Sequence, residues 1–143
     1  MRAGTENVAG IVGMAVALKE HIDNLESEMS YLSGLSQQFV EDLKKYGLDF
    51  ILNGSPQRIP GSISVSFRNA DGEMLLHRLD LMGTAVGTGS ACDSKETVLS
   101  HVIRSIKSPN EFAYGTIRIT LGMDNTADDV HRIAAQLNKI LKK

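Results

Sequence analysis

The fold of this chain is decided by the stretch Gly115-Thr116-Ile117-Arg118-Ile119-Thr120-Leu121-Gly122. Its apolar side chains alternate with polar ones, and a period of two residues is typical of a β-strand with one buried face. Arg118 stands at a polar position, so its guanidinium is expected on the opposite, unburied face. The same alternation marks residues 62–67, and residues 50–52 form another short β-like run. Residues 84–87 are interpreted as a brief further strand.

Helical patterns surround these strands. Residues 22–46 carry apolar side chains at steps of three and four, which predicts a long amphipathic helix. Gly47 is suited to the left-handed conformation that ends helices. Residues 6–19 are also predicted to be helical, although each of their glycines costs about 1 kcal/mol relative to alanine. The apolar positions of the long stripe are Ile22, Leu25, Met29, Leu32, Phe39, Leu43 and Tyr46.

Further helices are expected after Asp71, after Asp93 and after Thr126. Asp71 and Thr126 are suitable N-cap residues, and Asp93 with Glu96 resembles a capping box. Acidic residues near the start of the last helix and lysines near its end favour the helix dipole. The side chains expected to face inward are Met74, Leu75 and Leu79, then Val98, Val102, Ile103 and Ile106, and finally Val130, Ile133, Leu137 and Ile140 or Leu141.

These elements predict one compact α+β domain. A length of 143 residues, with 42% hydrophobic and 22% charged residues, is ordinary for one globular unit. Strands interleaved with helices predict two layers, in which a small antiparallel or mixed sheet packs with helices. The long helix near the N-terminus precedes this sheet.

Charge and hydropathy exclude several classes of partner. The net charge is −2 and the basic residues are scattered, so nucleic acid is not an expected partner. The apolar run at residues 8–18 is too short to cross a bilayer, and no signal peptide is visible, so we expect a cytoplasmic protein without a membrane partner. The histidines lack a second ligand at metal spacing, so no metal site is expected and all are interpreted as structural or surface residues: His21, His77, His101 and His131.

Cys92 is the only cysteine, so it can form neither an internal disulfide nor a multi-thiolate metal site. It lies in a run of small residues, 87–94, which lets the backbone bend sharply and approach another molecule. A helix N-terminus and Lys95 would favour the reactive thiolate, whereas Asp93 would oppose it. A lone cysteine is more often a buried apolar side chain. The glycine-rich, polar surroundings favour an accessible, mobile thiol instead.

Two other segments allow a functional interpretation beside an ordinary one. Residues 2–7 precede a helix, where free N–H groups and the Thr5 hydroxyl could hold a phosphate. The ordinary interpretation is an N-cap, with Thr5 as the cap and Glu6 in the first turn. Arg118 presents a planar fork that matches a carboxylate, but a solvated surface arginine is the commoner case.

Together these segments resemble the C-terminal third of the NifS-like cysteine desulfurases, fold-type-I pyridoxal-phosphate (PLP) enzymes of the class V aminotransferase family. The resemblance spans essentially the whole chain, and the order of its motifs is specific. The motifs are Arg2-Ala3-Gly4-Thr5-Glu6-Asn7 with Gly10 and Gly13, Ser62-Ile63-Ser64-Val65-Ser66-Phe67, Thr88-Gly89-Ser90-Ala91-Cys92, Ser100-His101-Val102-Ile103 and the stretch from Gly115 to Gly122.

The resemblance implies a homodimer that uses PLP to move sulfur from L-cysteine onto its own cysteine as a persulfide, leaving L-alanine. The persulfide then passes to an acceptor protein, such as an iron–sulfur scaffold or a thiolation enzyme. Cys92 matches the catalytic nucleophile, on a loop that swings to the substrate. Arg118 matches the arginine that pairs with the substrate carboxylate, and Thr5 matches the threonine that reaches the cofactor phosphate of the neighbouring subunit.

The chain departs from the family pattern in two ways. Asp93 stands where many relatives carry a small neutral residue. The family's cofactor lysine, and its aspartate and histidine beside the cofactor ring, belong to an upstream domain that has no counterpart here. We therefore expect residues 1–143 to be a single C-terminal domain that does not bind PLP or turn over substrate alone, from a truncated gene, an isolated domain or a proteolytic product. Residues 1–20 would contact the cofactor domain, and residues 21–143 would form the small domain with the cysteine loop.

The sequence also allows two alternative functions. Another class V enzyme is possible, such as a selenocysteine lyase or a transaminase, although the former carries a different cysteine motif and the latter needs no thiol there. The chain could also be a stand-alone persulfide-relay or interaction module, in which Cys92 accepts sulfur from a separate enzyme without a cofactor.

Overall fold

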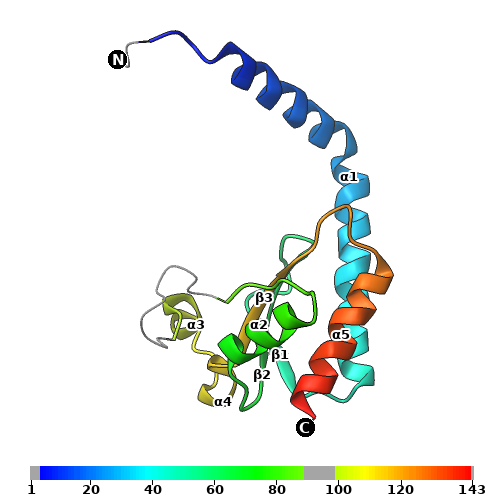
Figure 1. Cartoon of the computed structure of the whole chain (residues 1–143), viewed down its shortest axis with the longest axis vertical. Helices are drawn as coiled ribbons and strands as arrows, with labels where there is room; N and C mark the ends of the chain where they lie inside the picture. Colours follow the sequence, from blue (N-terminus) through cyan, green and yellow to red (C-terminus); the bar gives the residue numbers. More distant parts are fainter. Residues whose placement is uncertain (1–3, 89–98, 143) are drawn as a thin grey trace.

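A long helix and a small sheet organise the molecule, seen in a computed structural model that describes residues 4–88 and 99–142 (Figure 1). Helix α1 (Val8–Lys45) reaches far beyond the rest of the chain at its N-terminal end. Helix α5 (Ala127–Leu141) packs along its C-terminal half. The other elements are β1 (Phe50–Leu52), β2 (Ser62–Phe67), α2 (Gly72–Leu81), α3 (His101–Ser105), α4 (Asn110–Ala113) and β3 (Thr116–Thr120).

The sheet has two chemically different faces. Its strands run antiparallel in the order β1-β2-β3, which confirms the expected α+β fold with a small antiparallel sheet. One face carries Ile63, Val65 and Ile117, all buried, and packs against α1, α2 and α5. The other face carries the serines of β2 and the polar residues of β3. The buried apolar core comprises Leu35, Phe39, Leu43, Ile63, Val65, Phe67, Leu75, Leu79, Ile117, Ile119, Leu121, Val130, Ile133, Ala134, Leu137 and Ile140.

The predicted helix ends are largely confirmed. The Asp71 carboxylate accepts hydrogen bonds from the backbone N–H groups of the first turn of α2. Thr126 and Asp129 form a reciprocal capping box at the start of α5. Gly47 follows α1 with φ of 63°, in the left-handed region that glycine adopts without steric cost.

The N-cap of α1 is Asn7 and not Thr5, and Glu6 lies outside the first turn. The Asn7 side chain accepts a hydrogen bond of 3.1 Å from the backbone N–H of Gly10. A side chain on residue 10 would crowd this cap, because a Cβ there would lie 2.6 Å from Asn7 Nδ2. Gly10 therefore makes room for Asn7, which is among the best N-capping residues.

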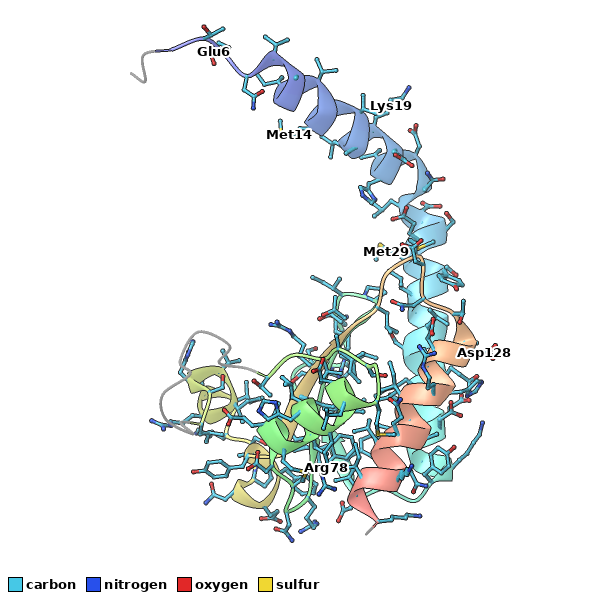
Figure 2. The ribbon with its side chains drawn as sticks, viewed as in Figure 1. Glu6, Met14, Lys19, Met29, Arg78 and Asp128 are labelled. Atoms are coloured by element: carbon cyan, nitrogen blue, oxygen red, sulfur yellow. The ribbon has the colours of Figure 1, made fainter. Side chains whose placement is uncertain are left out.

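The apolar stripe of α1 is buried only along its C-terminal half. The predicted segments 6–19 and 22–46 form one helix, but Ile22, Leu25 and Met29 are 61%, 50% and 46% exposed. Figure 2 shows Met14 and Met29 on the part of α1 that leaves the main body. The predicted amphipathic helix is thus present, but within the described chain α5 and the sheet cover only the later turns of its stripe.

The segment around α3 also differs from the prediction. Residues 84–87 form a single bridge, between Gly87 and Arg118, and not a strand. The predicted inward face after Asp93 is reduced to Ile103, since Val102 and Ile106 are 54% and 45% exposed. Val98 and the expected capping box of Asp93 and Glu96 lie outside the described residues. Helix α4 was not predicted; it is a single short turn without a hydrophobic period of its own.

Glycine is required where β3 begins. A Cβ on Gly115 would overlap the carbonyl oxygen of Phe67, and it would also crowd the Ala70 side chain. The close approach is fixed by a 3.1 Å hydrogen bond from the Phe67 N–H to the Gly115 carbonyl. The backbone cannot retreat without breaking this bond.

We therefore predict that Gly115→Ala lowers the free energy of unfolding by at least about 2 kcal/mol, as overpacking against backbone does. Gly34→Ala is the matched control, because nothing lies within 4 Å of a Cβ at that helical position. The control should stabilise the chain by about 0.5–1 kcal/mol. Equal effects of the two variants in urea unfolding would contradict this account.

A buried carboxylate joins α1 to α5. Asp42 is 5% exposed and hydrogen-bonds His131 across the interface. Gln38 and Lys45 donate to its other oxygen at 3.1 and 3.3 Å. Burial alone would raise the pKa of Asp42, but the hydrogen bonds from His131, Lys45 and Gln38 together hold the pKa below its ordinary value of 3.8. The ionised carboxylate is thus the form that the fold stabilises.

Because the pKa of Asp42 is lower in the folded state, its contribution to stability is present above the unfolded pKa and is lost as the pH falls through the folded pKa. We predict that wild type is more stable than Asp42→Asn at pH 6, and that this difference shrinks below about pH 4. Unfolding by urea at several pH values measures the difference. The exposed Asp124→Asn is the control, and a constant difference for Asp42→Asn would contradict the assignment.

Candidate functional site

Arg118 lies in the middle of the polar face of the sheet. It is exposed while its neighbours Ile117 and Ile119 are buried, as the alternation predicted. Within residues 4–88 and 99–142, its side chain forms no hydrogen bond or ion pair. Directly opposite Arg118 in the antiparallel register stands Ser64 of β2. Arg118 is thus an exposed cation that has no counterion among the described residues.

Gly87 flanks Arg118 on the other side. The two residues exchange backbone hydrogen bonds of 2.9 and 2.6 Å. The Arg118 guanidinium lies over this glycine, with Nη2 3.4 Å from the place a Cβ would take. A larger side chain at position 87 would compete for this space. The same glycine stands shortly before Cys92 in the sequence, at the start of the predicted cysteine loop.

A buried hydrogen bond fixes the segment that leads to Gly87. The Thr84 hydroxyl donates to Gln136 Oε1 of α5 at 2.7 Å, and both residues are buried. Gln136 in turn donates to the Met82 carbonyl at 3.0 Å. Because α5 also packs against the core, these bonds tie the approach to Gly87 to the rigid part of the molecule.

A chain of polar side chains runs beneath the same face. Asn53 donates to Ser64 Oγ at 3.1 Å and to Ser66 Oγ at 2.7 Å. The hydroxyls of Ser66 and Thr116 lie 2.6 Å apart, and Thr116 donates to the Ala113 carbonyl at 2.8 Å. Ser66 is fully buried, so these bonds satisfy a hydroxyl that would otherwise be costly to bury.

The other two predicted site residues are not brought to Arg118 within the described chain. Cys92 lies outside the described residues. Thr5 is exposed just before α1, at the end of the helix remote from the sheet, where Figure 2 labels its neighbour Glu6. Thr5 and Arg118 can therefore not share one ligand inside this chain.

The described residues do not supply a Schiff-base lysine for PLP. A Schiff-base lysine is activated by desolvation or a cationic neighbour, whereas every described lysine is exposed. These residues are Lys19, Lys44, Lys45, Lys107, Lys139 and Lys142. Over the same residues, no cluster of three or more His, Cys, Asp or Glu side chains is arranged to hold a metal ion. No described helix combines the length and apolarity needed to cross a bilayer.

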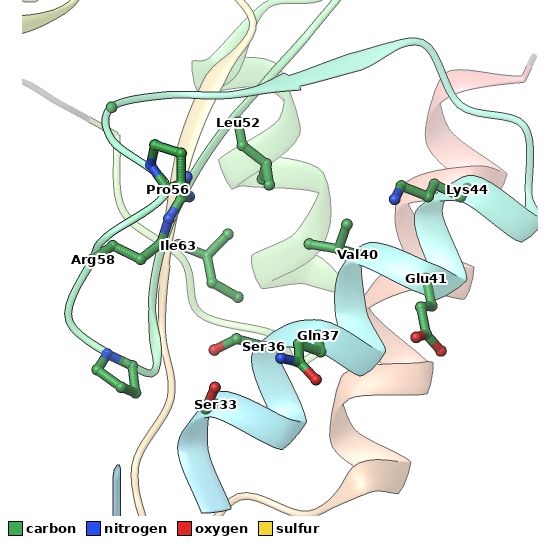
Figure 3. A pocket seen from close by; sticks show the side chains of 12 residues that line it. Ser33, Ser36, Gln37, Val40, Glu41, Lys44, Leu52, Pro56, Arg58 and Ile63 are labelled. Carbon is green, nitrogen blue, oxygen red and sulfur yellow. The ribbon is translucent and has the colours of Figure 1, made fainter. Parts of the chain in front are cut away.

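A groove of about 620 Å³ lies elsewhere, between α1 and the loop that joins β1 to β2 (Figure 3). Val40, Leu52 and Ile63 form apolar walls, and Lys44 and Arg58 lie on opposite sides. Ile63 belongs to the apolar face of the sheet, whereas Arg118 stands on the other face. The groove is therefore separate from the Arg118 site.

Sequence reasoning missed the partners of two residues. His131 was interpreted as a structural or surface residue without a named partner, and it pairs with Asp42, 89 positions away. Asn53 was not singled out at all, although it bonds two serines of β2. The serines at alternate positions, on the face of the sheet that Arg118 occupies, were a signal for a polar network. No local pattern indicated which side chain would complete it.

Comparison with known proteins places the site in context. A family model described as "Aminotransferase class-V" matches residues 1–133. "Cysteine desulfurase IscS" of Dictyoglomus turgidum is 42% identical over 143 residues, which are 99% of this chain and 36% of that protein. "Cysteine desulfurase NifS" of Azotobacter vinelandii is 30% identical, over 98% of this chain and 35% of that protein.

Solved structures agree with these matches. A NifS-like protein from Rickettsia africae superposes with a TM-score of 0.83 at 26% identity, over 99% of this chain and 37% of that one. Another NifS-like protein gives a TM-score of 0.81 at 29% identity, over 99% of this chain and 35% of that one. The chain spans about a third of the length of the curated relatives it matches.

Proposed function

The chain belongs to the class V aminotransferase family, and from this membership we propose that it forms the part of a cysteine desulfurase that binds the carboxylate of L-cysteine and receives its sulfur. The observation that carries the proposal is the pairing of Gly87 with Arg118. It joins the start of the cysteine loop to a cation that has no partner of its own among the described residues. The two relatives named above are cysteine desulfurases by their printed names.

Arg118 has the properties that a carboxylate-binding residue needs. Its guanidinium is permanently charged and can offer two parallel N–H donors to the two oxygens of a carboxylate. Its strand is anchored by a ladder to β2 on one side and by Gly87 on the other. These backbone hydrogen bonds therefore fix the point from which the Arg118 side chain extends. The amino acid would be held by the end remote from its sulfur.

Cys92 supplies the acceptor for that sulfur in this proposal. Its thiolate attacks the sulfur of L-cysteine, so that an S–S bond forms as the substrate C–S bond breaks. The electron pair of the C–S bond goes to the β-carbon, which takes up a proton and becomes the methyl group of L-alanine. Cys92 is left as a persulfide for an acceptor protein. PLP, bound by a cofactor domain, would supply the electron sink for this cleavage.

The N-terminal half of α1 fits the role of a contact with other protein. In the described chain, the apolar stripe of this half is exposed. It comprises Ile11, Met14, Leu18, Ile22, Leu25 and Met29. Contiguous exposed apolar surface of this kind indicates an interaction site. We assign residues 1–20 to contact with a cofactor domain, and Thr5 to the cofactor phosphate of a neighbouring subunit in a cytoplasmic homodimer.

Replacing the nucleophile tests the function. In a protein that joins this chain to its cofactor domain, Cys92→Ala should abolish sulfide release from L-cysteine, because no thiolate remains to receive the sulfur. Ser90→Ala, in the same run of small residues, is the matched control and should retain most of the activity. Undiminished release by Cys92→Ala would defeat the assignment of Cys92.

A second experiment separates the desulfurase from a stand-alone persulfide relay. A relay would gain one sulfur atom at Cys92 from a separate desulfurase, as seen by mass spectrometry, without any cofactor domain. The proposed function requires that the cofactor domain and this chain act together on L-cysteine.

The exposed stripe of α1 makes a prediction about association. The 143-residue chain alone should self-associate with rising concentration, because burial of this stripe removes apolar surface from water. Ile11→Lys together with Leu18→Lys should shift sedimentation toward the monomer. Leu81→Lys is the control, since Leu81 is 88% exposed on the main body. A wild-type chain that stays monomeric at high concentration would contradict the prediction.

A further inference from the structure

Ser64 occupies the position from which a second group could reach the ligand of Arg118. The two residues are partners in the β2–β3 register. Side chains directly opposite each other on one face of an antiparallel pair have Cβ atoms about 4.5–5.5 Å apart. Ser64 is half-buried, so its hydroxyl is still reachable from solvent. Its chemistry depends on whether its proton is free.

The directions of the hydrogen bonds in the polar network can be worked out from one end. Thr116 has a single hydroxyl proton and donates it to the Ala113 carbonyl, which can only accept. In the contact between Ser66 and Thr116, the proton must therefore come from Ser66. With its only proton used, Ser66 must accept from Asn53.

The orientation of the Asn53 amide follows from these same hydrogen bonds. An amide turned the other way would place Oδ1 against Ser66 Oγ, and two acceptors would face each other with no proton between them. The Nδ2 group must therefore point to the serines, and its two N–H donors serve Ser66 and Ser64. Ser64 is an acceptor in this bond and keeps its own proton.

We propose that Ser64 is a second substrate-binding residue, whose hydroxyl donates a hydrogen bond to the carboxylate that pairs with Arg118. Within the described residues, the Ser64 hydroxyl proton has no acceptor. Ser64 is the end of the polar network that stands directly opposite Arg118 in the register, while the guanidinium leans over Gly87 on the other side. A carboxylate has several lone pairs, so it can accept from the guanidinium and from the hydroxyl together. The inference rests on the proposed role of Arg118. Asn53 acts as a positioning residue, because its amide N–H donates a hydrogen bond to the Ser64 hydroxyl oxygen.

The test uses a pair of variants that have the same shape. Ser64→Thr keeps the hydroxyl and Ser64→Val removes it, and both branched side chains suit a strand. The ¹⁵N-labelled chain is titrated with sodium propionate, and the shifts of the Gly87 and Arg118 amide signals give the dissociation constant. We expect Ser64→Val to bind propionate about three- to tenfold more weakly than Ser64→Thr, which is the net effect of one typical hydrogen bond.

Controls keep this inference separate from the proposed function. Ser62→Ala lies on the same face of the same strand, opposite Thr120, and should leave propionate binding unchanged. Equal binding by Ser64→Val and Ser64→Thr would overturn the role of Ser64. If Arg118→Ala binds as tightly as wild type, the role of Arg118 in the proposed function is wrong, whatever the serine variants show.

A kinetic measurement provides the independent readout. In the protein with its cofactor domain, Ser64→Val should raise KM for L-cysteine relative to Ser64→Thr by a similar factor and leave kcat unchanged, because the carboxylate does not react. A fall in kcat with constant KM would show that the hydroxyl does not act through carboxylate binding, and would overturn the inference.

Discussion

The antiparallel pairing of β2 with β3 is the constraint on which the rest of the structure depends. Its register places Ser64 opposite Arg118 and Val65 opposite Ile117, so across these two strands one face is polar and the other is apolar. A slip of one residue would exchange the faces and put the arginine into the core. The required closeness of Gly115 to Phe67 helps to set this register, because only glycine fits there.

The two faces of the sheet have different roles: the apolar face packs into the core, and the polar face carries the candidate ligand-binding residue. Three helices bury the apolar face and hold the sheet rigid, with Asp42 and His131 joining α1 to α5 at the edge of that packing. On the polar face, Arg118 is exposed in the part of the chain that the structure describes. Arg118 stands on a strand whose backbone hydrogen bonds are satisfied on both sides, so the point from which its side chain extends is fixed.

Local patterns were sufficient for much of the fold. The strands β1, β2 and β3 and the caps at Asp71 and Thr126 follow from alternation and from side chains that compete for nearby backbone N–H groups. The N-cap of α1 was assigned to the wrong residue, since Thr5 and Asn7 are both good caps. The choice between them depends on Gly10, whose missing side chain gives Asn7 room. Cap propensity by itself does not contain that steric information.

The sequence by itself determined that Arg118 stands on a polar strand face, because a period of two residues needs no knowledge of the partner strand. It also determined the small-residue run around Cys92 and the family resemblance. Only the tertiary structure decided that Gly87 and Ser64 flank Arg118, and that α1 is buried along half of its length. The physical reason is that strand register and helix packing join residues far apart in the chain. The spacing of residues within one segment does not predict which distant residues they contact or how stable those contacts are.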